Sequence, residues 1–154
     1  MSEKAETNIH ASCVAIGDKG VLLVGPSGAG KSDLALRLID DGARLVADDR
    51  TVLFIAKGAL WAKAPPSIRG LIEIRGVGIV KLPVRAKVKI AIVVNLGKEA
   101  ERLPVHQSWK SPLKGAVPLP QITLDARFAA TPAKIRAALK AFSQGLFRTT
   151  FNPK

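Results

Sequence analysis

The chain has 154 residues, of which 47% are hydrophobic, so it can build one ordinary hydrophobic core but hardly two. We therefore expect a single domain over residues 1–154, with a frayed tail at 149–154. No apolar run approaches the roughly 20 residues of a membrane span, no signal-peptide pattern opens the chain, and the single Cys13 cannot form an intrachain disulfide. These features exclude a membrane-spanning class and predict a cytoplasmic protein, and the net charge of +12 favours polyanionic partners such as nucleotides, nucleic acid or an acidic protein.

The first predicted element is a pair of strands within residues 10–24, joined by a turn at 17–20. The second strand ends in the apolar run 21–24, and the next eight residues follow the phosphate-binding loop pattern G-x-x-x-x-G-K-[ST]. This motif requires a buried strand before it and a helix after it, because loop N–H groups and the helix N-terminus face the anion. The eight residues expected to bind a nucleotide are Gly25, Pro26, Ser27, Gly28, Ala29, Gly30, Lys31 and Ser32.

In this motif the lysine, here Lys31, reaches the β- and γ-phosphates, and the hydroxyl of Ser32 binds Mg²⁺. The helix that follows should begin at Lys31 and end near Asp41, because Gly42 suits the left-handed position after a helix. The loop therefore predicts a bound nucleotide triphosphate.

Further strands are predicted in the next part of the chain. Residues 44–47 form a short apolar strand, and 51–56 and 59–62 bracket a Lys-Gly turn as a hairpin. The segment 71–80 mixes strand-like alternation with two glycines, which favours a bend where another backbone or a ligand comes close.

The C-terminal part begins with residues 88–96, an almost uninterrupted β-rich run that is typical of the middle of a sheet. A polar loop region at 97–115 and a strand at 119–124 follow. We expect Thr131 to cap a last helix, with Pro132 at its first position, that runs to about Ser143. The predicted fold class is α/β with a mixed, partly antiparallel central sheet and few helices.

Three carboxylates stand out after the phosphate loop. Asp48 and Asp49 end a predicted strand about 17 residues after Lys31, where a phosphoryl-transfer enzyme places a carboxylate near the γ-phosphate. Neighbouring residues on a strand point to opposite faces, so one carboxylate can bind metal or water while the other accepts a proton. Glu73, inside an apolar stretch, has structural and functional interpretations of equal weight, and the lone His10 before the first predicted strand is more simply incidental.

Three segments together resemble one family. Residues 25–32, 45–49 and above all 71–79, Leu-Ile-Glu-Ile-Arg-Gly-Val-Gly-Ile, are similar to the catalytic domain of bacterial HPr kinase/phosphorylase, over about residues 8–125. The third segment resembles that family's own signature, which a generic phosphate-loop protein lacks. The resemblance implies a P-loop kinase domain of the HPr kinase and phosphoenolpyruvate carboxykinase-like type.

The activity implied by the resemblance is that of a serine kinase, using ATP and Mg²⁺, that acts on HPr, the phosphocarrier protein of the phosphotransferase system. Members of the family also reverse the modification with inorganic phosphate. Carried over by position, Lys31 is the phosphate-loop lysine, and Ser32 and Glu73 are metal-site residues. The pair Asp48 and Asp49 contains the proton acceptor for the substrate serine, and the distance along the chain from Lys31 favours Asp49.

The resemblance also implies that His10 is a catalytic histidine and, across an alignment gap, that Arg102 is a further catalytic arginine. Two departures concern the reverse reaction and the assembly. The family's longer glycine-containing loop is reduced to residues 81–87, and its basic Gly-Arg-Asn segment is not present near residues 120–127, although Arg127 offers a partial substitute. The forward kinase reaction is therefore better supported than phosphorolysis.

Full-length relatives have an additional N-terminal domain, so this chain resembles the short form of some proteobacteria. The family implies a hexamer. The alternative from composition is an ATP-binding regulatory or nucleic-acid-binding module without transferase activity. The sequence disfavours nucleic-acid binding, because it has no zinc-ligand spacing, no RNA-binding signature and no tyrosine for a stacking platform.

Overall fold

The computed structural model describes residues 5–99 and 101–148, and these residues form one large sheet, a separate two-stranded ribbon and two α-helices. In chain order the elements are β1 (Glu6–Ile9), β2 (Ala11–Ile16), β3 (Lys19–Val24), α1 (Lys31–Asp40), β4 (Arg44–Ala47), β5 (Thr51–Ala56), β6 (Ala59–Lys63), a 3₁₀ helix (Pro66–Ile68), β7 (Leu71–Ile74), β8 (Gly78–Lys81), β9 (Lys87–Leu96), β10 (Gln107–Trp109), β11 (Leu119–Leu124) and α2 (Thr131–Gln144).

The large sheet is mixed, as predicted. Its main path runs β1-β5-β6-β9-β3-β2-β4, and β11 adds to β9 and carries β10 at its outer edge. The pairs β3·β9 and β9·β11 are parallel, whereas the other ladders are antiparallel. The strand β9 lies in the middle of the sheet, because its apolar run can be buried on both faces. It pairs in parallel with β3, the strand that leads into the phosphate loop.

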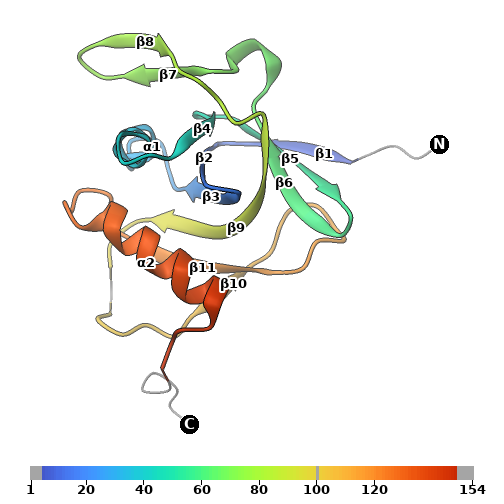
Figure 1. The fold of residues 1–154 in the computed structure, drawn as a ribbon, viewed down its shortest axis with the longest axis vertical. Coiled ribbons are helices and arrows are strands. Elements are labelled where there is room, and N and C mark those ends of the chain that lie inside the picture. The colour runs from blue at the N-terminus through green and yellow to red at the C-terminus, as the bar shows by residue number, and fades with distance from the viewer. Residues whose placement is uncertain (1–4, 100, 149–154) are drawn as a thin grey trace.

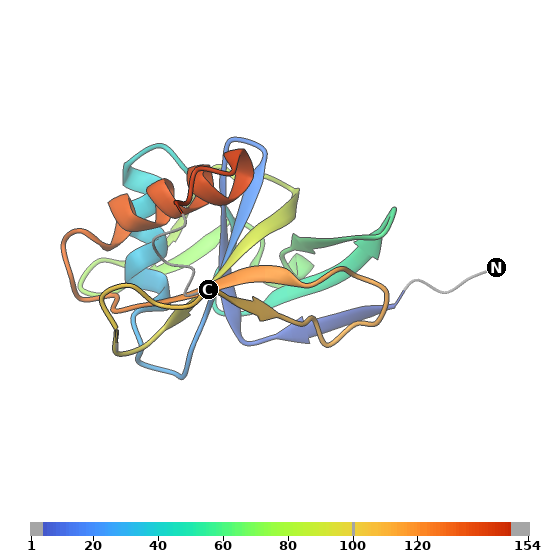
Figure 2. The same cartoon turned by 90° about the horizontal axis from the view of Figure 1, so that it is seen from below.

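Helix α1 lies between the β7–β8 ribbon and α2 (Figure 1). Its apolar residues Leu34, Ala35 and Leu38 recur at helical spacing and are buried against the sheet and α2. A second apolar cluster fills the opposite face of the curled sheet, beneath the chain that passes through Trp109 and Leu119. Figure 2 shows the same layers from below, with both helices on one side of the sheet. The start of α1 is thus held by a core on one side and by the ribbon on the other.

Cys13 lies in this second cluster and is fully buried. Burial raises the pKa of its thiol far above the ordinary range, because the thiolate would lose its hydration. Cys13 is therefore a packing residue and not a nucleophile.

Some elements differ from the prediction. The strand β1 was not expected, because its alternation of exposed and half-buried residues is short and it forms only by pairing with β5. The strand β10 lies inside the predicted loop 97–115 and depends in the same way on β11. Thr131 does not cap α2: Ala130 takes that position, and the Thr131 hydroxyl donates instead to the carbonyl of Asp125.

The predicted frayed tail at 149–154 lies outside the described residues. Neither α-helix in the described part of the chain is long and apolar enough to cross a membrane.

Candidate functional site

The phosphate loop joins the end of β3 to the start of α1. Its three glycines, Gly25, Gly28 and Gly30, all have positive φ, at 151°, 84° and 99°. A Cβ on Gly25 would lie 3.1 Å from the carbonyl oxygen of Leu96, so a side chain there would be strained and crowded. The first turn of α1 is closed by a hydrogen bond of 2.9 Å from the Leu34 N–H to the Gly30 carbonyl. The loop and the start of α1 thus have the backbone geometry that an anion site at a helix N-terminus requires.

Lys31 stands at the first position of α1 and is only 6% exposed. Its ammonium donates to the carbonyls of Gly25, at 2.8 Å, and Pro26, at 3.0 Å. Burial lowers the pKa of Lys31, and the nearby carboxylates of Asp49 and Asp48 oppose that shift. The lysine is thus held against the loop, at the place where phosphate oxygens could replace the two carbonyls.

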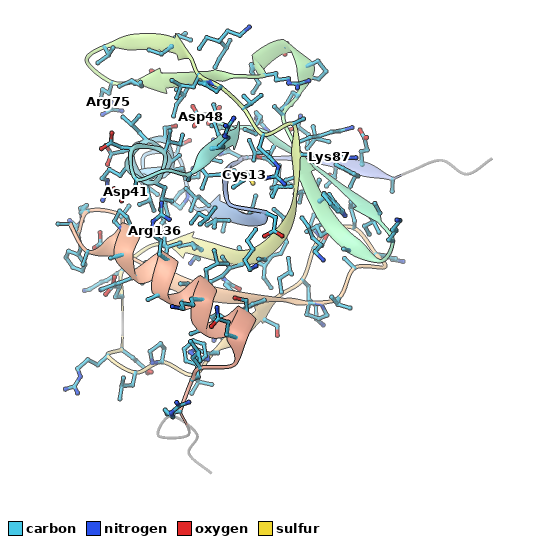
Figure 3. All side chains as sticks on the ribbon, viewed as in Figure 1. Cys13, Asp41, Asp48, Arg75, Lys87 and Arg136 are labelled. Atoms are coloured by element: carbon cyan, nitrogen blue, oxygen red, sulfur yellow. The ribbon has the colours of Figure 1, made fainter. Side chains whose placement is uncertain are left out.

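Asp48 is buried beside α1, in the bend after β4 (Figure 3). Its carboxylate accepts hydrogen bonds from the hydroxyls of Ser32, at 2.6 Å, and Ser12, at 3.0 Å, and a longer one of 3.4 Å from the Glu73 N–H. Three donors satisfy this buried charge, as a carboxylate in such a place requires. Asp48 therefore connects the phosphate loop to β2 and β7.

Asp49 has a different environment although it is the next residue. Its side chain is 63% exposed, and a hydrogen bond of 2.8 Å joins its carboxylate to Nε2 of His10. Its φ of 69° is in the left-handed region, so the alternation rule for strands does not apply to the pair. The two carboxylates nevertheless have different environments: Asp48 is buried against Ser32, and Asp49 faces solvent beside a histidine.

Ser12 is a site residue that the sequence reasoning missed. It is fully buried in β2, and its hydroxyl donates to Asp48 while it accepts from the Asp49 N–H at 3.0 Å. A single hydroxyl thus fixes both aspartates. The only signal in the sequence is a serine within the buried strand Ala-Ser-Cys-Val-Ala-Ile, which does not reveal its partner.

A cavity of about 520 Å³ opens over the phosphate loop. It brings together five of the seven residues predicted to be catalytic or to bind the metal, and the buried Asp48 contacts it through Ser32. Arg102 is the exception, because it lines a second cavity, of about 610 Å³, that shares no lining residue with the first. The residues lining the first cavity are His10, Ser27, Gly28, Gly30, Lys31, Ser32, Asp33, Leu36, Asp49, Glu73, Ile74 and Arg75.

The donors in this cavity suit Mg²⁺. The Ser32 hydroxyl and the Asp48 carboxylate are already in contact, and Glu73 lines the same cavity. All three are hard oxygen donors, and Mg²⁺ is usually bound through one or two carboxylates together with substrate phosphates and water. Among the described residues no group of three or more His, Cys, Asp or Glu side chains could hold a metal by itself. The residues therefore fit a metal ion that is shared with a nucleotide.

A strand, a glycine-rich loop and a helix, with a Lys-Ser pair at the helix start and a buried aspartate on the serine, define a phosphate-loop nucleotide-binding protein. The family model for the HPr serine kinase C-terminal domain matches residues 2–139. The chain therefore belongs to that family.

Curated relatives include HPr kinase/phosphorylase 1 of Oceanobacillus iheyensis, 38% identical over 134 residues that cover 79% of this chain and 43% of the relative. The HPr kinase/phosphorylase of Leptothrix cholodnii is 35% identical over 134 residues, which cover 78% of this chain and 41% of the relative. This chain thus spans less than half the length of these relatives.

A solved structure, that of the HPr(Ser) kinase/phosphatase from Coxiella burnetii, superposes with a TM-score of 0.77 at 26% identity. The alignment covers 91% of this chain and 98% of that structure. The mixed sheet with two helices is therefore the fold of this family, as the sequence predicts.

Proposed function

We propose that this chain is an ATP-dependent serine kinase whose protein substrate is a phosphocarrier of the HPr type. Family membership and the names of the relatives support the reaction class. The observation that carries the proposal for this chain is the contrast between its two aspartates. Asp48 is buried on Ser32, whereas Asp49 is exposed, paired with His10 and placed on the wall of the phosphate cavity.

The phosphate loop and Lys31 would bind the triphosphate. The positive φ angles of the three glycines curl the loop, so that its N–H groups can face the phosphates. Lys31 would exchange its two backbone carbonyls for β- and γ-phosphate oxygens. Ser32, Asp48 and Glu73 would hold Mg²⁺, which supplies charge neutralisation on the phosphates when bound.

Asp49 would act as the general base. The hydroxyl oxygen of the substrate serine forms a bond to the γ-phosphorus, the bond from that phosphorus to the bridging oxygen of ADP breaks, and the serine proton passes to the Asp49 carboxylate. His10, in contact with that carboxylate, would orient it toward the serine. An exposed carboxylate suits this task because a protein substrate must reach it from outside.

The forward reaction is proposed as the main activity. The relatives are named as phosphorylases or phosphatases as well as kinases, and the basic Gly-Arg-Asn segment associated with the reverse reaction is not present here near residues 120–127. We further propose a hexameric assembly, from the family resemblance. Light scattering of the purified chain would measure it, and a monomer would contradict this part of the proposal.

The function is tested with ATP radiolabelled on the γ-phosphate, Mg²⁺ and a purified HPr-type protein. We expect label on the phosphocarrier, and none on a matched phosphocarrier whose acceptor serine is replaced by alanine. Binding of ATP without transfer would favour the alternative of a nucleotide-dependent regulatory module. An affinity for DNA or RNA that falls steeply with log[salt] would favour the nucleic-acid alternative.

A further inference from the structure

The segment 125–128, called the strap below, lies against the phosphate loop. Its residue Ala126 is 5% exposed and belongs to the apolar cluster around α1. The approach is close: a Cβ on Gly30 would lie 3.1 Å from the Cβ of Ala126. Gly30 is the residue from which α1 begins and it lines the phosphate cavity, so the strap packs directly against a residue of the anion site.

Arg37 of α1 holds the strap in this position. One terminal nitrogen of its guanidinium donates to the Ala126 carbonyl, and the other donates to the Phe128 carbonyl at 3.2 Å. Its Nε donates to Asp33 at 3.2 Å, which fixes the guanidinium on the helix. Gly30 and Arg37 are seven positions apart, two helical turns, so both lie on the same face of α1, under the strap.

The strap has two other anchors that do not involve Arg37. The Asp125 N–H donates to the Glu99 carboxylate at 3.0 Å, and the Thr131 hydroxyl donates to the Asp125 carbonyl at 2.5 Å. Asp125 also pairs with the exposed Arg127, whose hydrogen bonds lower the pKa of Asp125 to about 2. Loss of Arg37 would therefore loosen the strap at Ala126 and Phe128 and leave its Asp125 end attached.

We propose that Arg37 is a positioning residue for nucleotide binding: by clamping the strap against Gly30, it fixes the phosphate loop and the first N–H groups of α1. This role deepens the proposed function, and it depends only on the binding of a nucleotide by this loop. The physical reason is that the glycines make the loop conformation easy to change, and a wall against Gly30 removes that freedom before the phosphates arrive. An arginine suits the task because its planar fork can donate to two carbonyls at once.

The test is the dissociation constant of Mg²⁺·ADP, measured by calorimetry on the full chain. We expect Arg37→Ala to weaken binding about tenfold, the size of one lost charge-assisted hydrogen bond. We expect Arg37→Lys to weaken binding almost as much as Arg37→Ala does, because one ammonium cannot replace the planar fork of the guanidinium. In transfer assays the KM for ATP should rise in the same proportion, with kcat little changed.

Arg136 provides the matched control. Its guanidinium donates to the carbonyls of Leu38, at 3.3 Å, and Asp41, at 3.1 Å, where α1 and α2 meet (Figure 3). It thus makes the same kind of contact with backbone carbonyls, at the end of α1 that is remote from the phosphate loop. Arg136→Ala should lower the melting temperature as Arg37→Ala does and leave ADP affinity unchanged. Equal losses of affinity in both variants, or none in Arg37→Ala, would overturn the proposal.

Two further variants separate clamping from charge. In the Asp33→Asn background, Arg37→Ala should still weaken ADP binding. If the double variant had the full ADP affinity of the unaltered chain, Arg37 would serve only to neutralise Asp33, and the proposal would be overturned. Ala126→Gly removes the methyl that faces Gly30, so it should weaken binding a few-fold and reduce the further effect of Arg37→Ala. If the effects of Ala126→Gly and Arg37→Ala on ADP affinity were additive, the proposal would be overturned. If Arg37→Ala does not fold, the combination of Ala126→Gly with Arg37→Lys provides the same test.

The two proposals fail in different ways. An unaltered chain that binds ADP and does not phosphorylate an HPr-type protein contradicts only the proposed function. An unaltered chain that binds no ADP overturns both.

Discussion

The two cavities of this chain are similar in size, about 520 and 610 Å³, but they are built differently. The first draws charged groups from strands and from the start of α1, and several of them are held by hydrogen bonds: Lys31 donates to two loop carbonyls, and Asp49 is paired with His10. The second takes Arg102 and Val105 from the connection between β9 and β10, where both are exposed. What distinguishes the candidate active site is therefore the preorganisation of its charges and not the size of the cavity.

The largest effect is expected from Lys31→Ala. The variant loses the ammonium that contacts the loop, so phosphoryl transfer to an HPr-type protein should fall by at least about 10²-fold. Radiolabel transfer under saturating ATP measures this. Activity above a few per cent of the unaltered chain would remove Lys31 from the catalytic set.

The two aspartates should then separate chemistry from binding. We expect Asp49→Asn to reduce transfer by about 10²–10⁴-fold and to leave Mg²⁺·ADP affinity nearly unchanged, because the amide keeps the shape but accepts no proton. Asp48→Asn is the matched variant, and it should weaken both nucleotide affinity and folding, because a buried acceptor of three hydrogen bonds is altered. Equal losses of transfer and binding in Asp49→Asn would assign Asp49 to the metal site.

Apolar residues near the two cavities should contribute differently to the free energy of unfolding. Leu34 is fully buried in the apolar cluster around α1, so Leu34→Ala should lower the free energy of unfolding by about 2–5 kcal/mol. Val105 in the second cavity is 70% exposed, so Val105→Ala should change it by no more than about 0.5 kcal/mol. Urea denaturation measures both, and similar losses would contradict the comparison.

The smallest effect on the nucleotide is expected from Arg102→Ala. Because Arg102 lines the second cavity, ADP affinity should stay within about twofold of the unaltered chain. Arg102 can act in transfer only if its loop approaches the phosphates when the protein substrate binds. In that case Arg102→Ala should lower transfer about tenfold, the effect of one lost charge-assisted contact. Unchanged transfer would exclude Arg102 from catalysis, and a loss of ADP affinity would place it at the nucleotide.

Most of the strands and both helices could be predicted, because each depends on the pattern of its own residues. The run β9 is apolar along most of its length, and the glycine after α1 ends that helix. The strands β1 and β10 could not be predicted, since each is short and is stabilised by a distant partner strand. The cap of α2 was predicted wrongly because the Thr131 hydroxyl donates to the carbonyl of Asp125, just after β11, and does not cap the helix.

The sequence by itself determined the phosphate loop, its Lys-Ser pair and the spacing to the aspartates, because glycine conformations and helix starts are local properties. Only the tertiary structure decided that Asp48 is buried and Asp49 exposed, that Ser12 holds both, and that Arg37 reaches a carbonyl 89 residues away. These contacts join residues from different strands and helices. Their partners are set by how the sheet and helices pack, which no local pattern records.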